Sequence, residues 1–371
     1  MHRPLSPAIS THYQRALGDL RDHPRVWLVT GVAGFIGSNL LEALLGLGQT
    51  VVGLDNFSTG LQSNVDEVLA QHADAARSFR LIRGDIRDLE VCREACAGVE
   101  LVLHQAALGA SPRSMRDPMT TNGVNVSGFL NLLVAARDAR VRRVVYASSS
   151  SVYGDAAALP QVEDHVGHPL SPYAVTKCAD ELYAGVFQRA FGLEVVGLRY
   201  FSVFGRRQDP SGEYAAVIQQ WIGNLLRNAP CRIMGDGEAT RDYCYVANAV
   251  QANILAAMAA SSATNEVYNV ACGESTTLNE LFRMIRLGLA GFTRTIAADP
   301  VYEPASAESV PTCAVSIDKA RERLGYEPTH RVSDGLSEAL AWYVTSSRIA
   351  RAREGARDRG EYDRAPLEAV V

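Results

Sequence analysis

A tyrosine and a lysine four residues apart form the part of this chain best suited to acid–base chemistry. Tyr173 and Lys177 lie in the segment SPYAVTKCADELY, and on a helix residues with this spacing share one face. A lysine ammonium beside a phenol favours the phenolate, so the tyrosine becomes usable as a general acid or base near neutral pH. An exposed helical tyrosine would give the same spacing, so the rest of the sequence must decide.

A glycine-rich turn supplies the first supporting signal. Gly31, Gly34 and Gly37, in VTGVAGFIG, follow an apolar run at 26–30 and precede a helical pattern. Glycine allows the backbone to turn tightly and approach a pyrophosphate, whose charge the helix N-terminus stabilises. Asp55 ends the next apolar run, about 20 residues further on, where a carboxylate hydrogen-bonds a ribose 2′-hydroxyl. Because a carboxylate repels a 2′-phosphate, we expect NAD and not NADP.

A serine-rich strand end supplies the second signal. Ser149 lies in YASSSSVYGD, between the glycine turn and Tyr173. We expect its hydroxyl to hydrogen-bond the substrate oxygen that gains and loses a proton while the adjacent carbon exchanges hydride with NAD. Ser149, Tyr173 and Lys177 are therefore the predicted catalytic residues.

Alternating apolar runs and helical patterns surround these residues. Strands of a parallel sheet are predicted at 26–30, 51–54, 79–83, 101–105, 143–148 and 194–199. Helical patterns at 38–46, at 124–139 and after Pro172 separate them, which favours an α/β fold with a doubly wound Rossmann sheet. Beyond residue 204 the alternation weakens, so we expect a smaller, mixed α/β C-terminal lobe that binds the substrate.

The domain boundaries follow from these patterns and from composition. We expect an N-terminal extension at 1–24, an NAD-binding Rossmann domain at 25–204, a substrate lobe at 205–345 whose chain is partly interleaved with the Rossmann domain, and a flexible tail at 346–371. The tail is expected to be flexible because it contains hardly any aliphatic side chains to bury.

Composition and charge exclude several other classes of protein. A net charge of −5 gives no basic surface for nucleic acid, and no apolar run approaches the ~20 residues of a membrane span. Cys92 and Cys96 lie one helical turn apart, but no second pair or nearby histidine completes a metal site, so we predict no metal. The scattered cysteines are interpreted as reduced thiols of a cytoplasmic protein.

With these motifs in place, the chain resembles the extended short-chain dehydrogenases/reductases. Within that group it is similar to the bacterial UDP-N-acetylglucosamine 4-epimerases of polysaccharide biosynthesis. The resemblance runs from about residue 25 to residue 343, and its most specific stretches are VWLVTGVAGFIGSNLLEALL, GLDNFSTG, VLHQAALGASPRS, LSPYAVTK, GLRYFSVFGRRQDP and GDGEATRDYCYVANAVQAN. It implies that the tyrosine removes the 4-hydroxyl proton while the C4 hydride passes to a tightly held NAD, and that the 4-keto sugar turns over and takes the hydride back.

The resemblance and the motifs together assign the binding residues. The expected NAD contacts are Gly31, Gly34, Phe35, Ile36, Gly37, Asp55, Asn56, Phe57, Ser58, Gly60, Asp85, Ile86, Gln105, Ala106, Ala107, Asn125, Tyr173, Lys177, Tyr200 and Val203. The expected contacts of a UDP-sugar substrate are Arg113, Ser149, Ser150, Ser151, Tyr173, Ser202, Ala216, Val217, Arg241 and Cys313. A homodimer is implied through the helices at 126–139 and 174–187.

Two features favour epimerisation of an N-acetylhexosamine. Related dehydratases and decarboxylases carry carboxylates just before a Tyr-Gly pair, whereas this chain has Ser149, Ser150 and Ser151 before Tyr153. By the resemblance, Cys313 occupies the position where a small residue admits a 2-acetamido group; simple core packing of Cys313 is the alternative.

Other substrate positions depart from the family pattern. Ser202, Ser306 and Ser309 stand where an asparagine, an arginine and an aspartate are usual. Arg241 remains a candidate for binding the diphosphate, and Arg206, Arg207 or Arg321 are alternatives. Another NAD-dependent nucleotide-sugar epimerase or oxidoreductase therefore stays open, as does an NAD-binding protein without catalytic activity.

Overall fold

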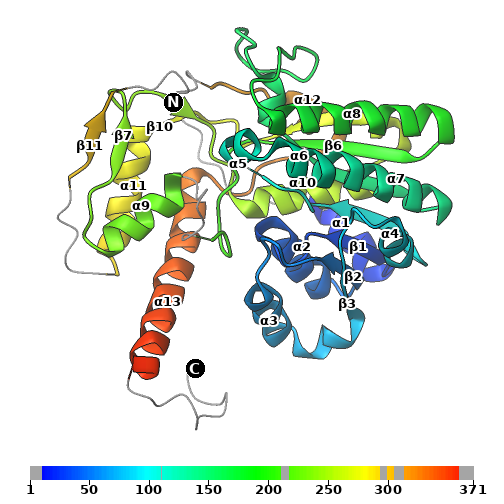
Figure 1. Cartoon of the computed structure of the whole chain (residues 1–371), viewed down its shortest axis with the longest axis horizontal. Coiled ribbons are helices and arrows are strands. Elements are labelled where there is room, and N and C mark those ends of the chain that lie inside the picture. Colours follow the sequence, from blue (N-terminus) through cyan, green and yellow to red (C-terminus); the bar gives the residue numbers. More distant parts are fainter. Residues whose placement is uncertain (1–10, 110, 210–216, 293–298, 305–312, 359–371) are drawn as a thin grey trace.

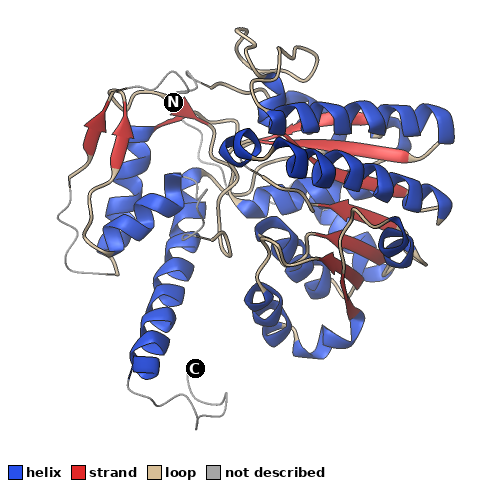
Figure 2. Ribbon diagram, viewed as in Figure 1, coloured by secondary structure: helices blue, strands red, loops and turns tan. Residues whose placement is uncertain are grey.

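A seven-stranded parallel sheet is the centre of the molecule. The computed structural model describes residues 11–109, 111–209, 217–292, 299–304 and 313–358. The strands have the order β3-β2-β1-β4-β5-β6-β9, and every neighbouring pair is parallel (Figures 1 and 2). Their bounds are β1 Val26–Thr30, β2 Thr50–Asp55, β3 Phe79–Arg83, β4 Leu101–His104, β5 Arg143–Ser149, β6 Glu194–Tyr200 and β9 Glu266–Val270. The predicted doubly wound Rossmann sheet is confirmed.

Helices cover both faces of this sheet, which explains why its strands are almost continuously apolar. One face packs on α1 Thr11–Asp22, α2 Phe35–Gly46, α10 Val246–Met258 and α12 Asp318–Leu324. The other packs on α4 Leu89–Cys96, α7 Gly128–Asp138 and α8 Pro172–Phe191. Successive residues of a strand alternate between the two cores: Leu28 belongs to the second, and its neighbours Trp27 and Val29 to the first.

The strand order reverses direction next to β1. From β1 the chain first builds outward through β2 and β3, and then crosses over to β4 on the opposite side. The loops at the carboxyl ends of β1 and β4 therefore diverge and leave a crevice, which is where ligands bind in open α/β sheets. The remaining elements of this half are α3 Gln62–Gln71, α5 Ser111–Arg116 and α6 Pro118–Asn122, with short helical turns at 73–78, 123–127, 150–153 and 261–263.

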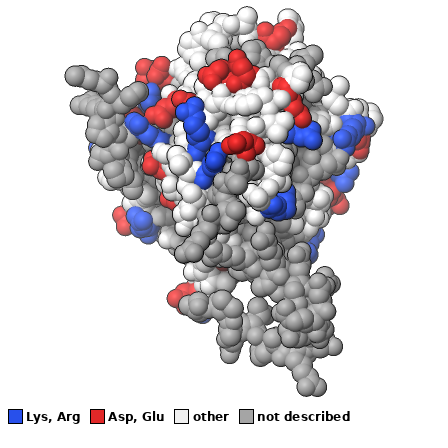
Figure 3. Space-filling view, turned by 90° about the vertical axis from the view of Figure 1, so that its left-hand side faces the viewer, with Lys and Arg blue, Asp and Glu red and all other residues white. Residues whose placement is uncertain are grey.

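A smaller lobe with its own core lies to the left in Figure 1. It contains α9 Val217–Leu226, α11 Leu278–Ala290 and α13 Val332–Asp358, with two small sheets made of β7 Arg232–Met234 with β11 Val301–Glu303 and of β8 Thr240–Arg241 with β10 Thr276–Thr277. On the face of this lobe seen in Figure 3, basic and acidic side chains are interspersed. Because β9, α10 and α12 return to the large sheet, the chain is interleaved between the two parts.

Both ends of the described chain are helical, and the C-terminal end differs from the expectation. The predicted N-terminal extension contains helix α1, whose Leu20 is buried in the main core. Helix α13 continues to Asp358, so 346–358 is helical where composition predicts a flexible tail, and 359–371 lies outside the described residues. Extending a helix that is already nucleated adds a hydrogen bond per residue, and the Ala, Arg and Glu of this segment favour helix. None of the described helices is long and apolar enough to span a membrane.

Candidate active site

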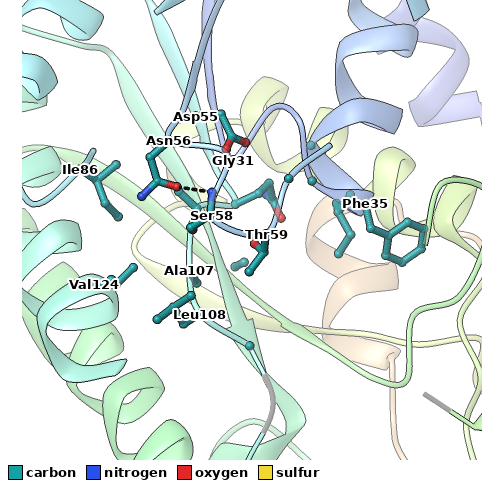
Figure 4. A pocket seen from close by; sticks show the side chains of 18 of the residues that line it. Gly31, Phe35, Asp55, Asn56, Ser58, Thr59, Ile86, Ala107, Leu108 and Val124 are labelled. Atoms are coloured by element: carbon teal, nitrogen blue, oxygen red, sulfur yellow. Dashed lines mark hydrogen bonds between the residues drawn. The ribbon is translucent and has the colours of Figure 1, made fainter. Parts of the chain in front are cut away.

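The crevice contains a cavity of about 500 Å³ at the carboxyl ends of β1, β2, β4 and β5. Most of the predicted NAD contacts line it together: Gly31, Gly34, Phe35, Ile36, Gly37, Asp55, Asn56, Ser58, Gly60, Ile86, Gln105, Ala106, Ala107, Tyr173, Lys177, Tyr200 and Val203. Figure 4 labels Gly31, Asp55 and Ile86 among them. The cavity is therefore built from segments that are far apart in the sequence.

Three of the predicted NAD contacts are absent from the cavity lining. Asp85 instead accepts a hydrogen bond from Asn56 Nδ2 at 2.8 Å and pairs with Arg87, which lowers the pKa of its carboxyl. Asn125 bonds both backbone groups of Leu108 and the hydroxyl of Thr176. The third is Phe57. Asp85 and Asn125 thus stabilise the loops around the cavity without lining it.

The glycine turn between β1 and α2 has no room for side chains. Gly31 has φ +68°, and a Cβ on it would lie 2.8 Å from the backbone nitrogen of Ala106. A Cβ on Gly37 would lie 2.0 Å from the carbonyl oxygen of Gly31. No side chain caps the first turn of α2, since its N-cap residue is Gly34. Phe35, Ile36 and Gly37, in the first turn of α2, line the cavity, and the N–H groups of a first helical turn, which have no acceptor within the helix, suit a pyrophosphate, as NAD requires.

Asp55 lies at the end of β2, directly beside this turn. Its Oδ2 accepts from the backbone nitrogen of Ala33 at 2.9 Å, and its Oδ1 accepts from that of Phe57 at 2.8 Å. Burial raises the pKa of the carboxyl, and the two backbone donors act against this rise. In Figure 4 the loop continues through Asn56, whose Oδ1 accepts from Ser58 N at 3.0 Å. Asp55 therefore orders the loop and also presents a carboxylate to the cavity.

The three predicted catalytic residues line the same cavity. Tyr173 and Lys177 lie in the first turns of α8, whose N-cap Ser171 accepts from Ala174 N at 3.2 Å. Lys177 is buried, and its Nζ donates to the carbonyl oxygen of Ala147 on β5 at 2.9 Å. Ser149 ends β5, so the strand end and the helix start place a hydroxyl, a phenol and an ammonium around one space.

The predicted substrate contacts are more widely spread. Apart from Ser149 and Tyr173, none of them is among the cavity-lining residues, and Ala216, Ser306 and Ser309 lie outside the described residues. Ser150 and Ser151 form the turn after β5, Arg113 lies in α5, Val217 begins α9, Ser202 follows β6, and Arg241 is in β8. Cys313 is next to β8, since its N donates to Thr240 O at 3.2 Å.

The alternative arginines are engaged elsewhere. Arg206 and Arg207 both pair with Glu42 of α2, and Arg321 pairs with Asp318 at 3.6 Å. Arg241 donates to the carbonyl oxygen of Thr240 at 2.8 Å.

Sequence reasoning missed several residues that line the cavity. They are Leu54, Thr59, Gly84, Leu108, Gly109, Val124, Ala147, Ser148 and Gln208. Most directly flank predicted residues, so extending each motif by one or two positions would have found them. Gln208 lies in the segment GLRYFSVFGRRQDP, and no signal in the sequence shows that it reaches the cavity.

Fold and cavity together define an NAD-binding enzyme of the extended short-chain dehydrogenase/reductase type. The chain belongs to the NAD dependent epimerase/dehydratase family, whose sequence model matches residues 27–271. The predicted enzyme class and the NAD cofactor are thereby confirmed.

Individual relatives agree with this assignment. The chain is 35% identical to a UDP-glucose 4-epimerase of Mycolicibacterium smegmatis over 86% of its own length and 99% of the relative. It is similar to the structure of a UDP-N-acetylglucosamine 4-epimerase from Methanobrevibacter ruminantium in complex with UDP-N-acetylmuramic acid, with a TM-score of 0.80 and 33% identity over 87% of this chain and 99% of that one. The Thermus thermophilus UDP-glucose 4-epimerase in complex with NAD gives a TM-score of 0.74 and 31% identity over 86% and 98%. These relatives support a nucleotide-sugar 4-epimerase and leave the sugar open.

Proposed function

We propose that this enzyme interconverts UDP-N-acetylglucosamine and UDP-N-acetylgalactosamine through a transient 4-keto sugar. The observation that carries the proposal is that Ser149, Tyr173 and Lys177 line one cavity with the glycine turn and Asp55. A proton acceptor and a nicotinamide site then face the same small space, as oxidation at a secondary alcohol requires.

Each catalytic side chain has a distinct task in this scheme. Tyr173 accepts the 4-hydroxyl proton and returns it in the second half of the reaction. The Lys177 ammonium favours the phenolate form of Tyr173. Ser149 hydrogen-bonds the same sugar oxygen; its own Oγ accepts from Ser151 N at 3.1 Å, which orients it. Bound NAD supplies the reversible hydride acceptor at C4.

The strand end favours epimerisation over elimination or decarboxylation. Those reactions need a further acid or base beside the sugar. The turn after β5 instead carries Ser150 and Ser151, whose side chains are hydroxyls. The two carboxylates of α8 near the strand end are both paired: Glu181 accepts two bonds from Arg199, at 2.9 and 2.8 Å, and Asp180 pairs with Lys177. Reversible oxidation at C4 needs no additional carboxylate.

One residue supports an N-acetylhexosamine as the sugar, and a second is the proposed ligand of the diphosphate. Cys313 is partly buried, and its Sγ lies 3.6 Å from Gln161 Oε1, so a small side chain occupies the position expected to face the 2-substituent. Arg241, on the neighbouring strand β8, is the proposed diphosphate ligand. The product would supply polysaccharide biosynthesis.

A panel of nucleotide sugars tests the proposal. Purified protein is incubated with UDP-N-acetylglucosamine, UDP-glucose and UDP-glucuronate, and both C4 inversion and NAD consumption are followed. We expect inversion of UDP-N-acetylglucosamine at the highest kcat/KM and no net NAD consumption. Preference for another sugar would shift the substrate assignment, stoichiometric NAD consumption would indicate a dehydrogenase, and no turnover on any sugar would indicate a non-catalytic NAD-binding protein.

We further propose that the enzyme forms a homodimer through α7 and α8. Three apolar side chains on one face of α8 are exposed: Val175 by 51%, Leu182 by 72% and Val186 by 47%. Their spacing of seven and four residues places them in one stripe, which pairing of two copies would cover. Light scattering of the wild type and of Leu182→Glu tests this, and a wild-type monomer would refute it.

A further inference from the structure

An acidic residue, Asp180, is buried beside Lys177, one helical turn further along α8. We propose that Asp180 is a positioning residue that holds the Lys177 ammonium and moderates its effect on Tyr173, thereby setting the pH at which this tyrosine exchanges protons. This inference rests on the proposed function, because it takes Tyr173 and Lys177 to be the catalytic pair.

The geometry places Asp180 directly on the lysine. Asp180 Oδ2 lies 3.2 Å from Lys177 Nζ, and both side chains are only 2% exposed. The same Nζ donates to Ala147 O at 2.9 Å, so two of its three hydrogens are held by the protein and one remains for a ligand. Asp180 Oδ1 is buried and has no hydrogen-bond partner among the described residues. The carboxylate therefore interacts with the lysine and with little else.

The other charged groups around the pair have separate partners. Glu181, next along α8, is bound by Arg199 of β6 and by Ser148 of β5. Arg199 in turn donates to Tyr153 OH at 3.1 Å. Within the described residues, Asp180 is thus the carboxylate that compensates the charge of Lys177.

Two further titratable groups face the pair from the sheet, and both are neutral. Burial, with the nearby Lys177 charge, lowers the pKa of His104 on β4 to about 3. Burial, with the nearby Glu181 and Asp180 charges, raises the pKa of Tyr146 on β5 well above its usual value. Neither group therefore changes charge in the neutral pH range, so Asp180 itself is the group that changes the local field.

Burial opposes ionisation of Asp180, while Lys177 favours it. The net effect raises the pKa of the Asp180 carboxyl to about 6. A buried ion pair is costly to form and is weak evidence for a stabilising role, so a functional role is the better explanation of its presence. In epimerisation Tyr173 must accept a proton and then return it, and an uncompensated lysine would favour the first step at the expense of the second. A lysine whose charge is partly compensated by Asp180 allows both proton acceptance and proton return.

Neutral substitution of Asp180 tests this role. Asp180→Asn keeps the shape and an oxygen acceptor for Lys177 but removes the negative charge, and Asp180→Ser is a second, smaller neutral variant. The pH midpoint of Tyr173 ionisation is read from the ultraviolet absorbance of phenolate, with the Tyr173→Phe variant subtracted. This signal needs no substrate. The matched control is Asp74→Asn, which removes the same charge from an exposed site.

We expect both Asp180 variants to move this midpoint to lower pH by about one unit, the order of magnitude for a unit charge roughly 10 Å away along a helix at an effective dielectric constant of ~20. The acidic limb of the kcat/KM profile should move by the same amount, and Asp74→Asn should move neither. An unchanged midpoint in folded Asp180→Asn and Asp180→Ser would overturn the inference. A shifted midpoint without epimerase turnover would uphold Asp180 and reject the proposed function.

Discussion

Ser148 Oγ lies 2.6 Å from Glu181 Oε1, and this hydrogen bond ties strand β5 to helix α8 immediately behind the cavity. The same carboxylate accepts two bonds from Arg199, and Arg199 continues the network to Tyr153. Tyr153 OH then donates to Asn269 Oδ1 on β9 at 2.6 Å. The relative position of Ser149 and Tyr173 therefore depends on a polar network that neither residue belongs to.

Glu181→Gln is expected to destabilise the protein by about 2 kcal/mol, because it leaves the buried Arg199 with a neutral partner. Urea unfolding measures this loss. Glu90→Gln, which breaks the exposed pair with Arg93, is the control and should cost less than ~1 kcal/mol. Equal losses in the two variants would contradict a special role for the network behind the site.

The ionisation of Asp180 predicts a specific pH dependence of stability. Its pKa in the folded protein, about 6, exceeds the unfolded value of about 3.9, so the folded state binds more protons in this interval. Its contribution to stability is therefore complete below about pH 4 and is lost as the pH rises through 6. Relative to Asp180→Asn, the wild type should lose roughly 2 kcal/mol of unfolding free energy between pH 4 and pH 7.5. A pH-independent difference between the two proteins would show that Asp180 does not titrate in this range.

Asp55→Asn is expected to weaken NAD binding and to reduce discrimination against NADP. The carboxylate accepts backbone hydrogen bonds on both oxygens, and an amide has only one acceptor oxygen, so one N–H of the loop loses its partner. A loss of about 1.4 kcal/mol or more corresponds to at least a tenfold higher Kd for NAD. Calorimetry on cofactor-free protein measures the affinities for NAD and for NADP. An unchanged ratio of NAD to NADP affinity would argue against contact between Asp55 and the ribose.

Ser202 has φ +33°, a left-handed conformation that serine adopts with strain and asparagine tolerates better. Ser202→Asn should therefore raise stability by about 0.5–1 kcal/mol, and it should also lower KM if the amide reaches the sugar, as the family resemblance implies. Thermal unfolding and steady-state kinetics check the two effects. Ser202→Ala is the control, and a stability gain in that variant would show that the backbone strain is not the cause.

Cys313→Tyr is expected to reduce activity on UDP-N-acetylglucosamine more than on UDP-glucose, because a bulky ring would fill the space for the acetamido group. A misfit of this kind is worth about 1–3 kcal/mol, or at least tenfold in the ratio of the two kcat/KM values. Cys313→Ala keeps the side chain small and should leave that ratio unchanged. If tyrosine lowers both activities equally, Cys313 is a packing residue.

The sequence predicts the parts of the site that depend on local spacing. Gly31 and Asp55 belong to one strand–helix–strand unit, β1-α2-β2, and Tyr173 and Lys177 belong to one helix, α8, so the relation within each pair follows from local geometry. The arrangement across the sheet follows from the parallel topology alone. Gly31, Asp55, Tyr173 and Lys177, whose relations could be predicted in this way, all line the cavity.

Relations between distant segments could not be predicted in this way. The contact between Cys313 and Gln161, 152 residues apart, depends on the path of the small lobe. The pairing of Arg207 with Glu42 and Glu67 likewise removes it from the candidates for phosphate binding, although its sequence context alone suggested that role. Such long-range partners are set by tertiary packing, for which a single sequence carries no periodic signal.

The central claim is tested most directly by incubating purified protein with UDP-N-acetylglucosamine, without added NAD, and following the C4 configuration by proton NMR. We predict that UDP-N-acetylgalactosamine appears and approaches a fixed equilibrium ratio, and that Tyr173→Phe abolishes this conversion while NAD stays bound. Wild-type protein that retains NAD but leaves UDP-N-acetylglucosamine unchanged would contradict the proposed substrate, and undiminished conversion by Tyr173→Phe would contradict the proposed mechanism.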